Sequence, residues 1–243
     1  MFRTLPALTI ATLLGAGALF GGCETDGGRL TERVFEERAS FRLVEDGDEA
    51  LEGGRTDLAM QKYAEAVARH SGNFEARLKL AKLQLARGQY AEAASQLRIV
   101  RTERPGDAEV LDALALALAR TGDAEGVERV LGERASITNG AADWLRYGRA
   151  LFELGDFDRA EEALKRAAEA DGGQNAVYQV ALAQFAERIG DDERALRRYR
   201  MALYADPSDQ AAREGIRRMG EVPGPSFALV PLEARPAAGA DGG

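Results

Sequence analysis

Apolar residues along this chain recur at helical spacing in two-part blocks, each divided by a glycine. In the clearest block, residues 74–105, one apolar run precedes Gly88 and a second run follows it. The runs comprise Leu78, Leu80, Ala81, Leu83 and Leu85, and then Tyr90, Ala93, Leu97 and Val100. Glycine readily adopts the left-handed conformation that ends a helix, and Pro105 cannot continue one. The block therefore predicts a helix, a short turn and a second helix.

This block occurs five times at a nearly constant interval. The dividing glycines are 34, 34, 33 and 35 residues apart, at Gly54, Gly88, Gly122, Gly155 and Gly190. Nine residues after them stand large side chains, at Tyr63, Leu97, Leu131, Leu164 and Tyr199. Helices of about a dozen residues are marginal alone in water, so each pair must bury the face of its neighbour. The period predicts an all-α solenoid of about five helix-turn-helix units.

The blocks resemble tetratricopeptide repeats, which carry a Leu-Gly or Leu-Ala pair, a later Gly, spaced Ala residues and a closing Pro. The matching pairs are Leu80-Ala81, Leu114-Ala115, Tyr147-Gly148 and Leu182-Ala183, with Asp46-Gly47 in the first copy. Trp144 holds the family's early aromatic position, and Pro105 and Pro207 are closing prolines. The resemblance implies a right-handed superhelix over residues 30–219. Its repeats lie near 40–73, 74–107, 108–140, 141–174 and 175–208, followed by a capping helix at 209–219.

The third copy departs most from this pattern. Val127 and Arg134 stand where small alanines are expected, and Gly126 and Gly132 lie inside the second helix. Each interior glycine costs about 1 kcal/mol relative to alanine. We therefore expect residues 123–139 to be the softest part of the array, either through neutral drift or because they form a hinge.

The two ends differ from the repeats. Residues 1–22 have the layout of a secretory signal: Arg3, then an uncharged apolar run from Leu5 to Phe20. The junction with Cys23, the only cysteine, resembles a bacterial lipobox, which implies that Cys23 is lipidated and begins the mature chain. The alternative is an uncleaved membrane anchor. Since Glu24 rather than Asp follows, the outer membrane is favoured over the inner.

Between and after these parts, three segments are predicted by composition. Residues 23–29 form a lipidated start and polar spacer, and residues 30–44 form a helix that leads into the first copy. Residues 220–243 are rich in Pro, Gly and Ala and are predicted to be disordered. Within them, the apolar residues 227–232 are either flexible or dock on the array or on a partner.

Composition narrows the function. The formal net charge is −8, which makes nucleic acid a poor partner. His70 is the only histidine and falls in a turn, so no His-paired zinc site or ordered nucleophile is expected. We expect no enzyme, no cofactor, no metal and no small-molecule substrate.

In the family that the chain resembles, partners bind on a concave face lined by the first helices. We counted back ten, six and three residues from each dividing glycine to predict that face. The predicted groove comprises Leu78, Lys82, Leu85, Leu116, Leu145, Arg149, Phe152, Val180 and Gln184. This mixture predicts capture of an apolar or amphipathic helical segment of a protein partner.

These inferences predict a lipid-anchored scaffold that faces the periplasm and gathers proteins of a cell-envelope complex. Two narrower alternatives remain. The layout also resembles pilotin-type lipoproteins, which assist secretins or the biogenesis of type IV or Tad pili. A third reading is an adaptor subunit of a periplasmic peptidase or cell-wall enzyme. The repeats determine shape rather than cargo, so they do not choose among these.

Overall fold

The computed structural model describes residues 26–234 of the 243-residue chain. The predicted signal segment 1–22 and the lipidation residue Cys23 lie outside the described residues, as does the last part of the predicted tail, 235–243. Within 26–234, no helix is long and apolar enough to cross a membrane.

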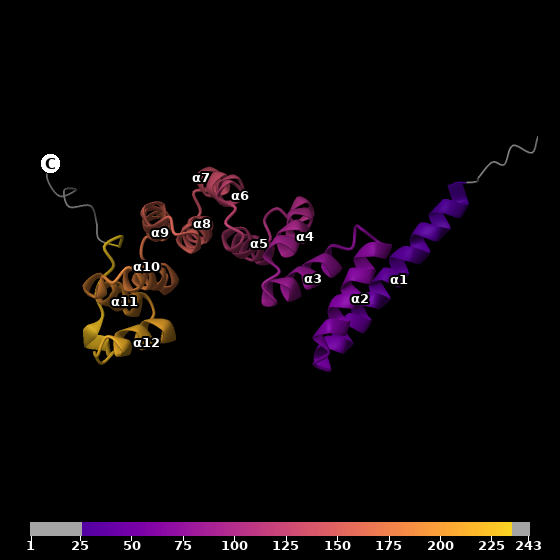
Figure 1. The fold of residues 1–243 in the computed structure, drawn as a ribbon. Coiled ribbons are helices and arrows are strands. Elements are labelled where there is room, and N and C mark those ends of the chain that lie inside the picture. Colours follow the sequence, from indigo (N-terminus) through magenta and orange to yellow (C-terminus); the bar gives the residue numbers. More distant parts are fainter. Residues whose placement is uncertain (1–25, 235–243) are drawn as a thin grey trace, which may run out of the picture.

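The described chain is all helical, as predicted, and its helices pack in antiparallel pairs along a curved superhelix (Figure 1). The pairs are α1 (Asp26–Glu52) with α2 (Thr56–Arg69), α3 (Phe74–Ala86) with α4 (Tyr90–Glu103), α8 (Ala141–Leu154) with α9 (Phe157–Asp171), and α10 (Ala176–Arg188) with α11 (Asp192–Ala205). In the third pair, α5 (Ala108–Arg120) contacts α6 (Ala124–Val127), and the second helix continues as η1 (Glu128–Gly132) and α7 (Glu133–Thr138). Helix α12 (Gln210–Arg218) follows the last pair, and η2 (Pro225–Phe227) is a single 3₁₀ turn.

The turns form where the sequence places glycine and short polar residues. All five dividing glycines have φ between 71° and 83°, a region that favours glycine. A helix begins two residues after each of the five glycines, and Asp123, Asp156 and Asp191 cap three of these helices by accepting a backbone N–H three residues on. These local preferences fix the helix boundaries independently of the packing.

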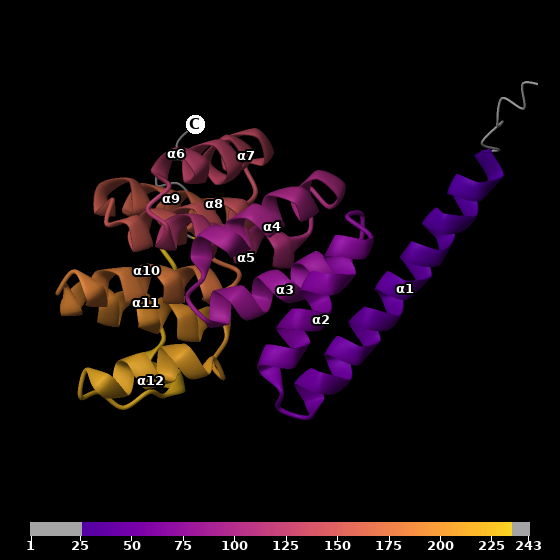
Figure 2. The same cartoon turned by 45° about the vertical axis from the view of Figure 1, so that its right-hand side comes forward.

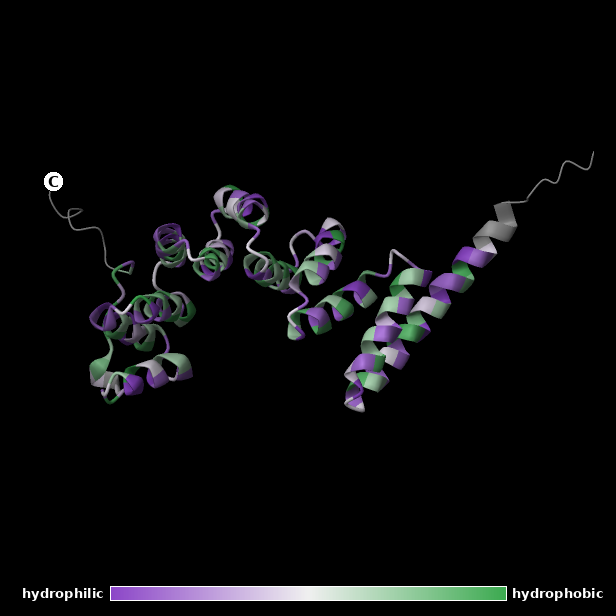
Figure 3. Cartoon of the chain, in the orientation of Figure 1, coloured by the Kyte–Doolittle hydropathy of each residue, from purple (hydrophilic) through white to green (hydrophobic). Residues whose placement is uncertain are grey.

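Three clusters of buried apolar side chains hold the stack together. The largest runs from α3 to α10 and includes Leu97, Leu114, Leu131 and Leu164. A second cluster joins α10, α11 and α12, and a third joins α1, α2 and α3. Figure 3 shows the hydrophobic residues as interrupted stripes along the helices. Each pair therefore depends on its neighbours for burial, as expected of a repeat array.

Three tyrosines link adjacent helices through a carboxylate and a cation. Tyr63 donates to Asp48 (2.6 Å), which also accepts from Lys79 of α3 (2.6 Å). Tyr199 donates to Glu187 (2.6 Å), which accepts from Arg218 of α12 (2.9 Å). In both cases the cation belongs to the next helix pair or cap. The links therefore run across the boundaries between repeats.

The third such link forms in the middle of the array. Tyr147 of α8 donates to Glu128 of η1 (2.6 Å), and Arg159 of α9 pairs with the same carboxylate. Hydrogen bonds from Tyr147 and Arg159 hold the pKa of Glu128 below its usual range, although burial opposes them. Burial and the bond to Glu128 raise the pKa of Tyr147 to about 12.

Helix α1 differs from the prediction. Instead of a helix over 30–44 leading into a first repeat, one helix runs from Asp26 to Glu52, and it includes part of the predicted spacer 23–29. The helix is not interrupted in this stretch, and even Gly47 lies in its interior. A Cβ at Gly47 would stand 2.5 Å from Cε1 of Tyr63, so glycine is needed here for close packing of α1 on α2.

The third copy is irregular, as its glycines indicate. Its second helix contains a π-helical turn, η1, between two short α-helices. Val127 is fully buried in the place of the usual alanine, whereas Arg134 turns outward to pair with Asp143 at 2.9 Å. Asn139 ends α7 with a φ of 47°. Arg134 can therefore stand at a position where the repeat pattern has alanine, because its side chain points out of the core.

The end of the chain differs from the disorder predicted for residues 220–243. As far as residue 234 the segment lies against α10 and α11, and Phe227 and Ala228 pack on the C-terminal cluster. Pro231 is buried, and Glu233 pairs with Arg198 at 2.6 Å. The composition of this stretch did not predict its order, because the residues that hold it belong to helices earlier in the chain.

Candidate partner-binding groove

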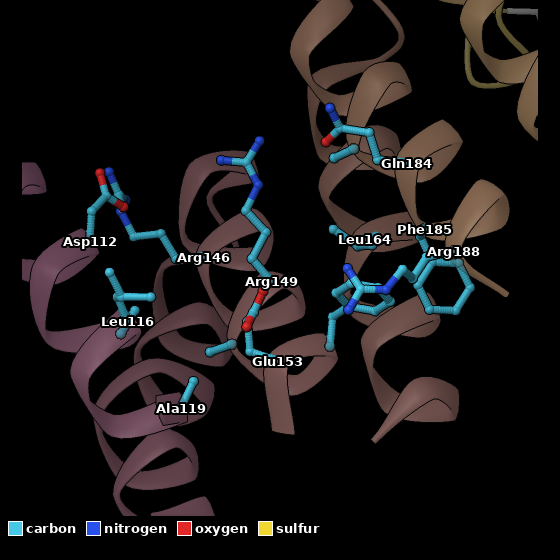
Figure 4. Close-up of a pocket in the computed structure, with 14 residues that line it drawn as sticks. Asp112, Leu116, Ala119, Arg146, Arg149, Glu153, Leu164, Gln184, Phe185 and Arg188 are labelled. Carbon is cyan, nitrogen blue, oxygen red and sulfur yellow. The ribbon is translucent and has the colours of Figure 1, made fainter. Parts of the chain in front are cut away.

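A hollow of about 490 Å³ lies between α5, α8 and α10, the first helices of three consecutive repeats (Figure 4). It is lined mainly by apolar side chains with charged groups at the edges. The lining residues are Asp112, Ala115, Leu116, Ala119, Arg146, Arg149, Ala150, Phe152, Glu153, Leu164, Ala181, Gln184, Phe185 and Arg188.

Small residues on its helices leave the groove unfilled. Ala115 and Ala119 of α5, Ala150 of α8 and Ala181 of α10 leave room that longer side chains would fill. Aromatic rings close one part of the hollow: Phe152 lies 5.7 Å from Phe185, centroid to centroid, in an edge-to-face arrangement. The volume falls in the range typical of ligand-binding pockets.

Charges at the α5 side of the groove are paired. Arg146 binds Asp112 at 2.6 Å and Asp143 at 3.1 Å. Burial alone would raise the pKa of Asp143, but hydrogen bonds from Arg134 and Thr138 hold it below its usual range. Glu153 is likewise paired, with Arg120 of α5 at 3.0 Å. These pairs brace α5 against α8.

Two arginines of the groove are different. Within the part of the chain that the structure describes, Arg149 makes no ion pair or hydrogen bond, and its guanidinium stands apart from Asp112 in Figure 4. Arg188 lies over the ring of Phe152, 5.4 Å from its centroid, and has no carboxylate partner among the described residues. Arg146, the third arginine of the lining, is by contrast paired with two carboxylates. The groove therefore presents uncompensated positive charge beside apolar surface.

The structure brings together four of the predicted groove residues. Leu116, Arg149, Phe152 and Gln184 all line the hollow. Leu78 and Leu145 are instead buried in the central cluster, and Val180 is buried in the C-terminal one. These three occupy the position ten residues before the dividing glycine, which in their helices faces the next helix rather than the groove.

The remaining two predicted residues lie outside the hollow, on α3. Lys82 is exposed and pairs with Glu109 of α5. Leu85 is half-buried against the central cluster. Neither lines the hollow, which begins at α5.

Counting from the glycine also missed several lining residues. In α5 the lining positions are ten, seven, six and three before Gly122, whereas in α10 they are nine, six, five and two before Gly190. The groove face thus shifts by one residue over two repeats, because a superhelix rotates each helix relative to the last. Allowing for this twist would have found Arg146, Phe185 and Arg188.

The described residues hold no group of three or more His, Cys, Asp or Glu side chains placed to bind a metal. The polar groups at the groove are arginines, paired carboxylates and one amide, Gln184. The lining therefore offers apolar contacts and charged groups.

Comparison with known proteins agrees with the fold. Residues 50–117 and residues 141–185 match two models described as tetratricopeptide repeat. No curated protein sequence matches the chain.

Several solved structures are similar to the chain at low sequence identity, and the two MamA structures below share its fold. A crystal structure of MamA protein is 20% identical, covers 79% of this chain and 98% of its own, and superposes with a TM-score of 0.53. MamA from Desulfovibrio magneticus is 16% identical over 71% of this chain and 97% of its own, with a TM-score of 0.51. A thermophilic TPR protein from Thermus thermophilus is 24% identical over 75% and 98%, with a TM-score of 0.49. The two family matches, together with the 33- to 35-residue period and the paired helices, show that the chain contains tetratricopeptide repeats.

Proposed function

We propose that this protein is a scaffold whose groove between α5, α8 and α10 holds an apolar or amphipathic helical segment of a partner protein. Tetratricopeptide-repeat domains bind proteins and peptides. The observation that supports this use of the groove is its combination of an open apolar floor with an unpaired cation, Arg149. Leu116 is 40% exposed at the edge of the same hollow.

The partner segment is expected to carry acidic residues beside its apolar ones. A helix laid in a groove contacts it through side chains spaced three or four residues apart. Apolar side chains would cover Leu116 and Phe185, while a carboxylate would meet Arg149 or Arg188. Such charges set orientation and association rate more than total affinity.

A charge placed on the groove tests this directly. Leu116→Glu adds a carboxylate to the apolar edge of the groove. It should lower the recovery of partner at least about tenfold, which corresponds to a loss of only ~1.4 kcal/mol of binding free energy. The matched control is Ile99→Glu on α4, whose side chain is 39% exposed and does not line the groove. Partners are identified by photocrosslinking from a probe at position 149 in native membranes, followed by mass spectrometry.

The two variants must keep the helical circular dichroism and melting temperature of the natural chain. Equal recovery of the crosslinked partner with Leu116→Glu and with Ile99→Glu would contradict groove binding. Equal loss with both would show that general surface charge, rather than the groove, controls recovery.

The same proposal gives the scaffold a place in the cell envelope, supported by the sequence before the array. An apolar run that ends at the sole cysteine, Cys23, resembles a lipoprotein processing site. Lipidation would attach the array to a membrane facing the periplasm, with the outer membrane favoured by Glu24. Two or more acyl chains give stable attachment, unlike one.

Cys23→Ser tests the anchor separately from the groove. We expect this variant either to accumulate as an uncleaved precursor or to appear in the soluble periplasmic fraction. The readout is fractionation with immunoblotting, and incorporation of a labelled fatty acid gives an independent measure. Normal processing and membrane retention of Cys23→Ser would exclude acylation.

A further inference from the structure

The C-terminal segment 227–233 is held by side chains of the array at both of its ends. At the first end, Arg200 Nε donates to the carbonyl of Phe227 at 2.7 Å, and its guanidinium lies 4.4 Å from the centroid of that ring. The backbone N–H of Leu229 then donates to the carbonyl of Arg200 at 3.0 Å. One arginine of α11 thus contacts both the main chain and the ring of the segment.

At the second end, the array recognises a carboxylate. Arg198 Nη1 donates to Glu233 Oε1 at 2.6 Å, and Gln179 Nε2 donates to Glu233 Oε2 at 3.0 Å. Arg198 also donates to Gln179 Oε1 at 2.8 Å, so the three groups form a closed network. The side chains of Arg198 and Glu233 are only 11% and 8% exposed, although both belong to the surface of the array and its tail.

Between the two ends, a proline fits against the turn from α9 to α10. A Cβ at Gly173 would stand 2.7 Å from Cβ of Pro231, so the absence of a side chain at Gly173 makes room for the proline. Arg200 therefore contacts an aromatic ring and the main chain, the α9–α10 turn contacts a proline, and Arg198 and Gln179 contact a glutamate.

This pattern is that of a bound peptide more than that of a core. Apart from η2, the segment has no regular structure. Its contact at the second end is a buried ion pair between Arg198 and Glu233, and such pairs are weak evidence for net stability. Gln179, Arg198 and Arg200 are polar and would be solvated if the segment left, so the surface beneath it can exist uncovered.

We propose that α10, α11 and the α9–α10 turn form a second peptide-binding site, for which residues 227–233 are an internal ligand. In exchange for this segment the site takes an extended partner peptide with an aromatic residue and, six positions later, a glutamate. Gly173, Gln179, Arg198 and Arg200 do not line the groove between α5, α8 and α10, so this site is independent of the function proposed for that groove.

The test uses the full-length chain with its own segment weakened by Phe227→Ala and Glu233→Lys. A fluorescein-labelled peptide with the natural sequence of residues 222–234 is titrated into it, and anisotropy is measured. We expect saturable binding to this vacated chain and at least about tenfold weaker binding to the natural chain, because an occupied site must first release its internal ligand.

Matched variants establish which contacts the binding of the peptide depends on. The same peptide with Glu233→Lys should bind the vacated chain at least about tenfold more weakly, and Arg198→Ala in the vacated chain should weaken the natural peptide equally. Arg197→Ala is the control, since Arg197 is exposed and pairs with Glu193 of its own helix. It should leave binding unchanged.

Two results would overturn the second site. One is absence of saturable binding to a vacated chain that keeps its circular dichroism and melting temperature. The other is loss of cooperative folding in the vacated chain, because a site that accepts another peptide must be stable while open. Neither result would affect the groove on α5, α8 and α10.

Discussion

At the scale of single residues, two tyrosines replace leucine where a large apolar side chain is otherwise found. Tyr63 and Tyr199 stand nine residues after a dividing glycine, where the middle three copies have leucine. Their rings fill the same space, while their hydroxyls reach Asp48 and Glu187. The apolar pattern predicted the rings but not the hydroxyl contacts, because the carboxylates come from a different helix.

The close approach of Gly47 and Tyr63 gives a prediction about stability. In an exposed helix, Gly47→Ala would stabilise by up to about 1 kcal/mol. Here the added methyl would meet the Tyr63 ring at 2.5 Å, so we expect a destabilisation of about 1–3 kcal/mol in urea unfolding. The double variant Gly47→Ala with Tyr63→Leu should be more stable than Gly47→Ala alone.

That double variant recreates the pair found at the same positions of the second copy, Ala81 and Leu97, both fully buried. It therefore controls for the general effect of alanine on α1. Additive losses in the two single variants and the double variant would show that the ring and the glycine do not interact.

The carboxylates of the tyrosine links predict acid sensitivity. Hydrogen bonds from Arg218 and Tyr199 hold the pKa of Glu187 below its ordinary value of 4.5, although burial opposes this. A folded-state pKa below the unfolded value contributes stability above pH 4.5, which is lost as the pH falls through the folded-state pKa. The melting temperature should fall over that interval, and that of Glu187→Gln should fall less steeply.

Glu193→Gln is the matched control for this measurement. Glu193 is exposed and pairs only with Arg197 of its own helix among the described residues. Its replacement should leave the pH dependence of melting almost unchanged. An equal flattening of the pH profile in both variants would assign the acid sensitivity to surface charge in general.

At the scale of helices, the sequence was most informative about where each one starts and stops. The repeated glycine followed by Asp in three copies fixes both the turn and the cap, and these depend only on neighbouring residues. The orientation of a helix face is less local. Leu78, Leu145 and Val180 were assigned to the groove but are buried, because their exposure depends on the rotation between successive helix pairs.

The π-helical turn in the third copy predicts locally weaker protection. Residues 124–138 combine short helices with Gly126 and Gly132, and the glycines favour helix less than alanine does. We expect their amides to exchange with deuterium faster than those of α9, the second helix of the next copy. Equal protection in hydrogen-exchange mass spectrometry would show that packing of Val127 and Val130 fully offsets the irregular backbone.

At the scale of the whole molecule, the sequence predicted the array and a helix near 209–219, but neither the length of α1 nor the packed segment after α12. Composition suggested disorder after residue 220, whereas the segment to residue 234 is held by Arg198 and Arg200. No rule based on the segment itself could find this, since the contacts join residues about thirty positions apart. The length of α1 was not predicted for a related reason. The helix continues because no residue ends it, and the spacing of apolar residues does not reveal this.

The projecting end of α1 affects how close the repeats could lie to a membrane. In Figures 1 and 2 this helix extends past α2, and Glu36 near that end forms an ion pair with Arg69 of α2. The ten residues from Asp26 to Phe35 rise about 15 Å at 1.5 Å per residue. If the chain is tethered three residues earlier, this stiff stalk would hold the repeats clear of lipid headgroups. A cargo would then need an exposed segment standing off the bilayer, and a protein lying flat on it would pass unrecognised.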